Sequence, residues 1–134
     1  MIVSRIHPSR IAQLWEQIEP FLKDGIRFAG DDYTIDQIKV FLTLDQWLLI
    51  GIWEENKLCG AISVAFSNMP NHRIAFITSM GGRALTTKEN LEQFEALLRS
   101  FGATKIQGCV RKSVARLLRQ LDFKERYILV ERPL

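Results

Sequence analysis

The sequence predicts an α/β protein of the α+β type built on one mixed sheet, and three observations lead to this prediction. Strand-like runs of β-branched and aliphatic residues alternate with segments whose apolar residues recur at helical spacing. Three of these runs follow one another through short turns, which indicates an antiparallel meander. Later strands are separated by helices and need crossover connections. We expect a single domain over residues 1–134, with the order β-α-α-β-β-β-α-β-α-β and helices on both faces of the sheet.

The expected order opens with a short strand and two helices. Ile2 and Val3 form the strand, and Pro8 stands in the first turn of a helix that Pro20 should kink or end. Thr34 is expected to cap the second helix. The apolar faces consist of Ile11, Leu14, Trp15, Ile18 and Leu22 in the first helix and of Ile35, Ile38, Phe41 and Leu42 in the second.

The meander is predicted from three apolar runs, at residues 47–53, 58–67 and 73–80, which are joined by polar turns. Thr86 and Glu89 then form a capping box ahead of a helix. The order is completed by a strand at residues 103–110, a helix at residues 113–121 with Val114, Leu117, Leu118 and Leu121 facing inward, and a last strand from Tyr127 to Val130.

Composition excludes several classes of protein. Of the residues, 47% are hydrophobic and 25% are charged, as in ordinary globular proteins. No apolar run approaches the roughly 20 residues that a membrane-spanning helix needs, and the N-terminus lacks a signal-peptide pattern, so we expect a cytoplasmic protein. Cys59 and Cys109 are isolated within strand-like runs, which favours buried reduced thiols over a disulfide. No metal-ligand spacing is present, and we expect no metal site.

Charge is unevenly spread along the chain. Residues 99–134 hold nine basic and three acidic residues, a net charge of +6, which leaves −3 on residues 1–98. This asymmetry indicates a polyanionic or phosphorylated ligand, or it only keeps the surface soluble. Nucleic-acid binding is not expected, because no aromatic residues are interleaved among the cations of the last helix.

The stretch from Met80 to Arg83 is the best candidate for an anion site. Gly81 and Gly82 lie between a strand and a helix, where backbone N–H groups and the positive end of a helix suit a phosphate. The alternative is a strand-to-helix turn that needs positive φ.

The order of elements, together with two C-terminal segments, resembles the GNAT family of N-acetyltransferases, and in particular its compact, phage-encoded members. The segments are Gly102 to Gly108 (GATKIQG) and Ala115 to Glu125 (ARLLRQLDFKE). The resemblance implies that the third meander strand and the following strand splay apart, and that the pantetheine arm of acetyl-CoA lies between them.

The resemblance also implies roles for individual residues. The backbone of Ser79 and Met80 would accept the pantetheine arm, and Gly81, Gly82 and Arg83 would hold the pyrophosphate. The cations of the last helix would serve the coenzyme phosphates, or they form a solvated face opposite its apolar stripe. These cations are Lys112, Arg116 and Arg119.

The chain departs from the family pattern where catalysis is concerned. Its glycine turn is shorter than the usual acyl-CoA loop, and Leu118 and Arg119 stand where the family commonly has a tyrosine that protonates the departing thiolate. The strand at residues 73–80 has no carboxylate or histidine to act as a base. The candidates that remain are Asp32, Tyr33 and Tyr127, each of which also has a plain role as a turn residue or a strand aromatic.

Two functions follow from this pattern. The first is an N-acetyltransferase that moves acetyl from acetyl-CoA to an unidentified amine on a small molecule or a protein. The second is a GNAT-like protein without catalysis that serves a structural or binding role, in a phage virion or against a host protein, located in the virion or the host cytoplasm. Apolar strands at residues 47–53 or 127–130 can also pair across a homodimer.

Overall fold

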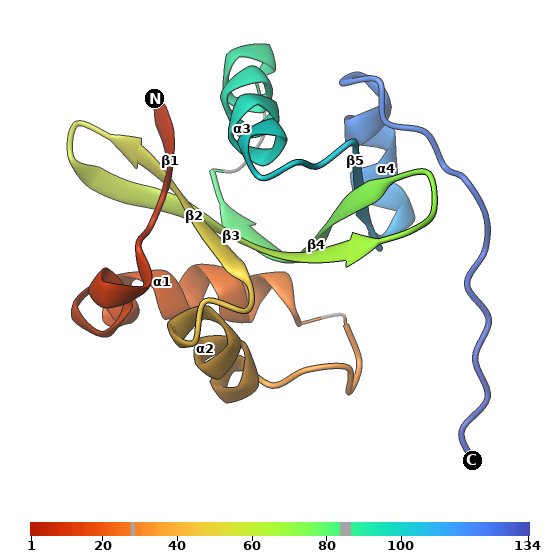
Figure 1. Cartoon of the computed structure of the whole chain (residues 1–134), viewed down its shortest axis with the longest axis horizontal. Coiled ribbons are helices and arrows are strands. Elements are labelled where there is room, and N and C mark those ends of the chain that lie inside the picture. Colours follow the sequence, from red (N-terminus) through yellow and green to blue (C-terminus); the bar gives the residue numbers. More distant parts are fainter. Residues whose placement is uncertain (28, 84–86) are drawn as a thin grey trace.

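Five strands form one sheet in the computed structural model, which describes residues 1–27, 29–83 and 87–134. The strand order is β1-β2-β3-β4-β5 (Figure 1). Each pair from β1 to β4 is antiparallel, and β5 runs parallel to β4, so the predicted mixed α+β fold is confirmed. The strands are β1 (Ile2–Arg5), β2 (Leu48–Glu54), β3 (Lys57–Asn68), β4 (Arg73–Gly82) and β5 (Lys105–Gly108).

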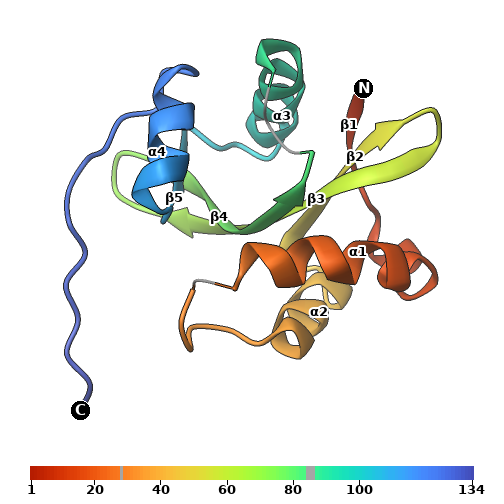
Figure 2. The same ribbon diagram turned by 180° about the vertical axis from the view of Figure 1, so that it is seen from behind.

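Helices cover both faces of this sheet, as the sequence predicts. Helices α1 and α2 lie on one face, and α3 and α4 lie on the other (Figures 1 and 2). A short 3-10 turn, η1, leads into α1. The bounds are η1 (Pro8–Arg10), α1 (Ile11–Gly25), α2 (Ile35–Thr43), α3 (Lys88–Ser100) and α4 (Lys112–Arg119).

The sheet separates two apolar cores, and β2 contributes to both of them. Its side chains alternate between the faces, so Ile50 enters the core under α3 while Leu49 enters the core under α1 and α2. Burial on both faces explains why β2 reads as an unbroken apolar run. The α3 core includes Val3, Ile52, Ile62, Val64, Phe94 and Leu98, and the α1 core includes Ile6, Ile18, Leu22, Ile38, Leu42 and Ala61.

Helix boundaries follow the predicted signals in part. Thr34 caps α2 in a full capping box with Gln37, which confirms that prediction. Helix α1 continues through Pro20 to Gly25, so the prediction that Pro20 could end this helix is wrong. Thr86 lies outside the described residues, and the residue that caps α3 is Thr87, whose hydroxyl accepts a hydrogen bond from the Asn90 N–H at 3.1 Å.

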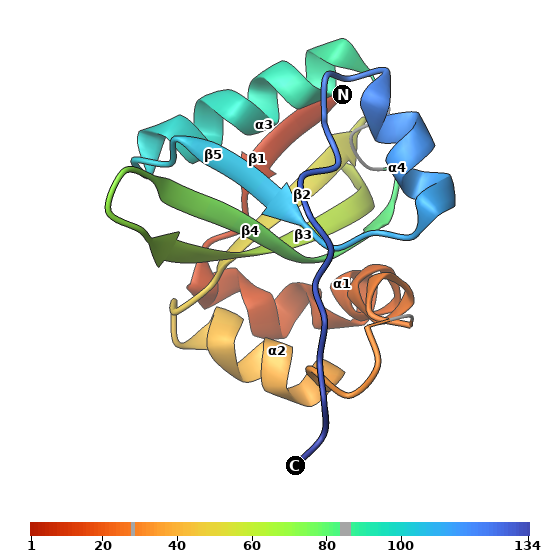
Figure 3. The same cartoon turned by 90° about the vertical axis from the view of Figure 1, so that its right-hand side faces the viewer.

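The C-terminal end differs from the prediction. No strand forms at residues 127–130, and the chain beyond α4 runs past the β5 edge as an extended segment (Figure 3). Leu117 is exposed rather than inward-facing, and Cys109 is exposed rather than buried. The run at residues 47–53 is no edge strand, because β2 lies between β1 and β3.

Candidate active site

A β-bulge in β4 marks the point where β4 and β5 part. The register of β4 with β3 shifts between Ser63 and Val64, which places Thr78 as the extra residue. The Thr78 hydroxyl donates to the Ser63 carbonyl at 3.0 Å, and the two hydroxyl oxygens lie 2.6 Å apart, so the bulge is held by buried hydrogen bonds. Pairing of β4 with β5 ends one residue earlier, at Ile77 opposite Gly108.

Beyond the bulge, β4 continues with β3 as its neighbour among the described strands. The Arg83 N–H donates to the Cys59 carbonyl at 2.8 Å. Bonded and non-bonded pairs alternate in an antiparallel ladder, so Met80 and Gly82 occupy non-bonded positions opposite Ile62 and Gly60. The N–H and C=O groups of Met80 and Gly82 therefore point away from β3. The end of α1 lies close to this backbone, since a Cβ on Gly25 would be 2.6 Å from the Met80 carbonyl oxygen and 2.7 Å from the Met80 nitrogen.

Gly81 and Gly82 belong to β4 itself and pair with Ala61 and Gly60, so the predicted turn begins later than expected. A Cβ on Gly81 would collide with the backbone carbonyl of Phe21 in α1. Gly82 has a φ of +78°, where L side chains are strained, and a Cβ there would collide with the Cys59 carbonyl. Both glycines are thus required by packing, which allows α1 to lie against β4.

Ser79 and Arg83 both have partners within the protein. The buried Ser79 hydroxyl donates to the Leu22 carbonyl of α1 at 2.7 Å. Arg83 donates from Nη1 to Glu54 Oε2 at 2.9 Å, at the surface where β2 ends. Ala84 and Leu85, which complete the predicted phosphate-binding turn, lie outside the described residues.

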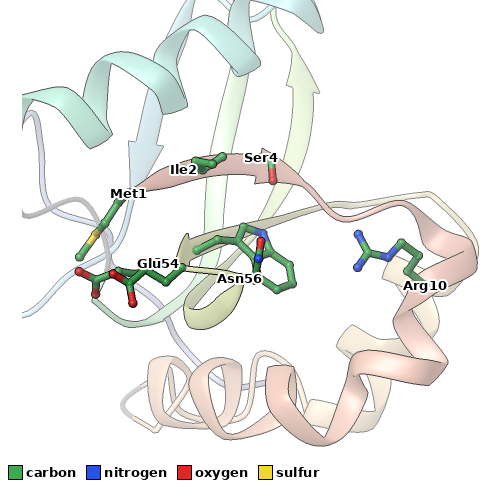
Figure 4. A pocket seen from close by; sticks show the side chains of 8 residues that line it. Met1, Ile2, Ser4, Arg10, Glu54 and Asn56 are labelled. Carbon is green, nitrogen blue, oxygen red and sulfur yellow. The ribbon is translucent and has the colours of Figure 1, made fainter.

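Glu54 also lines an open cavity of about 650 Å³ along β1 and the β2–β3 turn. Figure 4 shows Met1 and Glu54 at one end of this cavity and Arg10 at the other. The cavity lies beside β1, the edge strand opposite β5, so it is separate from the β4–β5 gap.

Tyr33 lies in the segment between α1 and α2, beside a second cavity of about 500 Å³. Its ring stacks edge-on against Trp47, with the centroids 5.4 Å apart. Burial, followed by the negative charges of Asp32 and Cys109, raises the pKa of Tyr33 above its ordinary value of 10.0. The cavity is lined by Pro20, Lys23, Asp24, Ile26, Arg27, Gly30 and Tyr33.

The remaining predicted site residues lie apart from this group. Lys112, Arg116 and Arg119 are exposed on α4, and Arg119 pairs with Glu125 at 3.1 Å. Tyr127 lies in the extended C-terminal segment with 74% of its surface exposed, and the Arg126 guanidinium lies over its ring at 5.1 Å. The structure therefore keeps Ser79 to Arg83 together on β4 and its end, whereas Tyr33, the α4 cations and Tyr127 lie on other segments.

Three residues of the site were not named from the sequence. Glu54 pairs with Arg83 from 29 positions away, and no local pattern signals this pairing. No local pattern signals the contribution of Cys109 to the raised pKa of Tyr33 either. Thr78 carried a usable signal, because Ser63 and Thr78 are polar residues inside two apolar strands, which is typical of a bulge or a buried polar pair.

Two findings concern other kinds of site. Within the described ranges, no cluster of histidine, cysteine, aspartate or glutamate side chains could hold a metal ion. Across the same ranges, none of the helices has both the length and the apolar character needed to cross a membrane.

Comparison with solved structures shows the fold of acetyltransferases. A probable acetyltransferase matches with a TM-score of 0.69 at 10% identity, covering 100% of this chain and 97% of that chain. An aminoglycoside acetyltransferase from an uncultured soil metagenomic sample matches with a TM-score of 0.69 at 14% identity, covering 99% and 97%. A second aminoglycoside acetyltransferase from an uncultured soil metagenomic sample, in complex with sisomicin, matches with a TM-score of 0.68 at 10% identity. The match covers 99% of this chain and 95% of that chain.

The likeness lies in structure rather than in sequence. No protein-family model matches the chain, and no curated protein matches its sequence. At identities of 10% to 14%, these three structures establish a shared fold.

Proposed function

We propose that the chain is an N-acetyltransferase that transfers acetyl from acetyl-CoA to an amine. The observation that carries this proposal is the end of β4–β5 pairing at Ile77, beyond which the backbone groups of Met80 and Gly82 point away from β3. A strand edge of this kind pairs with an extended ligand through its main chain, as an added strand would. The fold shared with acetyltransferases supports the same function.

The residues beside the gap fit the chemical groups of the coenzyme. The pantetheine arm is extended and has two amides, which suit the N–H and C=O groups of Met80 and Gly82 that are not bonded to β3. Arg83 provides a cation for the pyrophosphate once it exchanges Glu54 for this ligand. When bound, acetyl-CoA supplies an activated thioester, and the N–H of Met80 or Gly82 is placed to donate to its carbonyl oxygen.

We place the acceptor amine in the cavity beside Tyr33, which Asp24 lines together with Lys23 and Arg27. The Asp24 carboxylate is 3.6 Å from Arg27 Nη1, and the amine would have to replace this cation. The amine nitrogen attacks the thioester carbon, the C–S bond breaks, and the products are an amide and a thiol. The amine loses a proton to water or to the exposed Asp32 carboxylate, and the thiolate gains one. Because the pKa of Tyr33 is raised, its phenol stays protonated at neutral pH and can donate this proton.

Coenzyme binding tests the proposal directly. Acetyl-CoA at about 100 times its dissociation constant should raise the free energy of unfolding by about 2.7 kcal/mol, measured by urea titration. Thiol release with a panel of amines, aminoglycosides included, then tests turnover. ADP serves as a control for binding through phosphates alone. An unfolding curve that saturating acetyl-CoA leaves in place would exclude the proposed enzyme.

A second candidate function is a binding protein with the same fold and no catalysis. Two observations favour it: β4 carries no carboxylate or histidine, and the Ser79 hydroxyl is already bonded to Leu22. This candidate predicts no thiol release with any amine of the panel, with or without coenzyme binding.

A further inference from the structure

The last eleven residues, 124–134, form an extended segment that we call the C-terminal tail. Its central run is apolar and exposed: Tyr127 by 74%, Ile128 by 88%, Leu129 by 79% and Val130 by 84%. No backbone hydrogen bond joins the tail to any part of the chain that the structure describes. Four consecutive apolar side chains in water are costly to leave uncovered, which points to a partner surface.

The outer edge of β5 is the natural counterpart of this tail. In the described sheet, β5 pairs with β4 and is the last strand, so its other edge has no strand beside it. An open edge presents N–H and C=O groups that can accept a further strand. The tail has the extended backbone and the β-branched and aromatic residues that such a strand requires.

The charges of the tail and of the β5 edge also match. If Glu131 stands opposite Lys105 in an antiparallel pair, opposite charges meet at that end of β5. In the same register Glu125, which is 3.1 Å from Arg119 Nη2, falls opposite Arg111, the N-cap of α4. Val130 then faces Ile106, between these charged ends. The same register places Tyr127 opposite Cys109 and Ile128 opposite Gly108.

We propose that two copies of this chain exchange their tails, each tail pairing antiparallel with the β5 edge of the other copy. The chain is held at Phe123, whose N–H donates to the Leu118 carbonyl at 3.1 Å, and from there the tail leads away from its own β5 (Figures 1 and 3). Each copy thus has one spare strand and one spare edge. In a reciprocal exchange, each tail pairs with the open β5 edge of the other copy. No strand or edge is then left over, so the assembly stops at a dimer.

The exchange has a consequence for the candidate site, and this part rests on the proposed function. Tyr127 of the partner subunit would lie beside Cys109, at the end of β5. Cys109 directly follows Gly108, the last β5 residue that pairs with β4, so it lies where the gap between the two strands begins. A tyrosine that is remote from the gap within its own chain would therefore reach the gap of the second copy.

A cysteine crosslink tests the register and separates exchange from pairing within one chain. In the Tyr127→Cys variant, the new thiol should form a disulfide with the exposed Cys109 of the other copy, giving a covalent dimer on non-reducing gels. The matched controls are Ile128→Cys, whose side chain points to the other face of the strand, and Tyr127→Cys combined with Cys109→Ser. A bridge within one chain, or no bridge, would overturn the exchange.

Sedimentation of the full chain without coenzyme tests the dimer itself. Ile128→Pro removes a strand N–H in an exposed segment, and we expect at least a tenfold larger dimer dissociation constant with an unchanged melting curve of the monomer. Glu131→Lys should weaken the dimer about fivefold, and adding Lys105→Glu should restore it. A monomer at every concentration, or a dimer insensitive to these changes, contradicts the proposal. A dimer that binds no acetyl-CoA would refute the proposed function alone.

Discussion

Arg83 Nη1 lies 2.9 Å from Glu54 Oε2, so the cation that follows the diglycine is tied to the end of β2. Both side chains are largely exposed, and exposed ion pairs contribute about 0–1 kcal/mol to stability. The pair can therefore break at little cost when a stronger anion is present. Glu54 competes with any phosphate that Arg83 would bind.

Replacing Glu54 by Gln should tighten acetyl-CoA binding about two- to fivefold, because Arg83 no longer has to leave a carboxylate. Arg83→Gln should weaken binding. Isothermal titration calorimetry measures both effects, and Glu55→Gln, the same change at the neighbouring exposed position, is the control. If Glu54→Gln and Glu55→Gln change the affinity equally, Arg83 does not contact the coenzyme.

The diglycine should be more sensitive to Cβ atoms than an open glycine. We expect Gly81→Ala and Gly82→Ala each to lower the free energy of unfolding by about 2–4 kcal/mol, because the Cβ meets backbone atoms of α1 or β3. Gly30→Ala is the control, since Gly30 also has positive φ but no atom within 4 Å of an added Cβ, and it should cost about 1 kcal/mol. Equal urea midpoints for the three variants would refute the close contact between α1 and β4.

The hydroxyl pair at the bulge should contribute to stability as a unit. Thr78→Val leaves the buried Ser63 hydroxyl without its partner, and we expect a loss of about 1–3 kcal/mol in the free energy of unfolding. Adding Ser63→Ala should cost less than the sum of the single changes, because the two groups satisfy each other. Strict additivity in this double-mutant cycle would mean that the hydroxyls do not interact.

The raised pKa of Tyr33 makes stability depend on alkaline pH. The folded protein disfavours the phenolate, so this contribution is fully present below pH 10.0 and is lost as pH rises through the folded pKa. Unfolding free energies measured from pH 8 to pH 11 should fall less steeply in Tyr33→Phe. The chain has two tyrosines, so a Tyr127→Phe background isolates the absorbance of Tyr33. Asp32→Asn should lower the pKa of Tyr33, and an unchanged titration would mean that the Asp32 charge does not contribute to the raised pKa.

Local patterns predicted the elements whose signals are local. The apolar stripe of α1 and the N-cap at Thr34 are readable from neighbouring residues, and both predictions were correct. The strand expected at residues 127–130 failed because β-propensity depends on a partner strand, and the chain offers the tail none in this structure. Strand β4 extends through Gly82 because Gly81 and Gly82 pair with Ala61 and Gly60 of β3, and that pairing joins residues about 20 positions apart in the sequence.

The candidate site likewise has a part that could be predicted from local sequence and a part that could not. The predicted site residues from Ser79 to Arg83 lie on one strand, and they stay together because they are adjacent in sequence. The pairing of Arg83 with Glu54 depends on the sheet order, which fixes where distant segments meet. Sequence spacing contains no measure of this contact.

The extra residue at Thr78 also sets the phase of everything that follows it in β4. Ala75 and Ile77 face the α3 core, and the next side chain to do so is Met80, while Ser79 turns to α1. Removing one residue at this point would send Met80 toward α1 and rotate Gly81 out of its contact with Phe21. The number of residues between Ile77 and the diglycine is therefore fixed by the packing on both faces of the sheet.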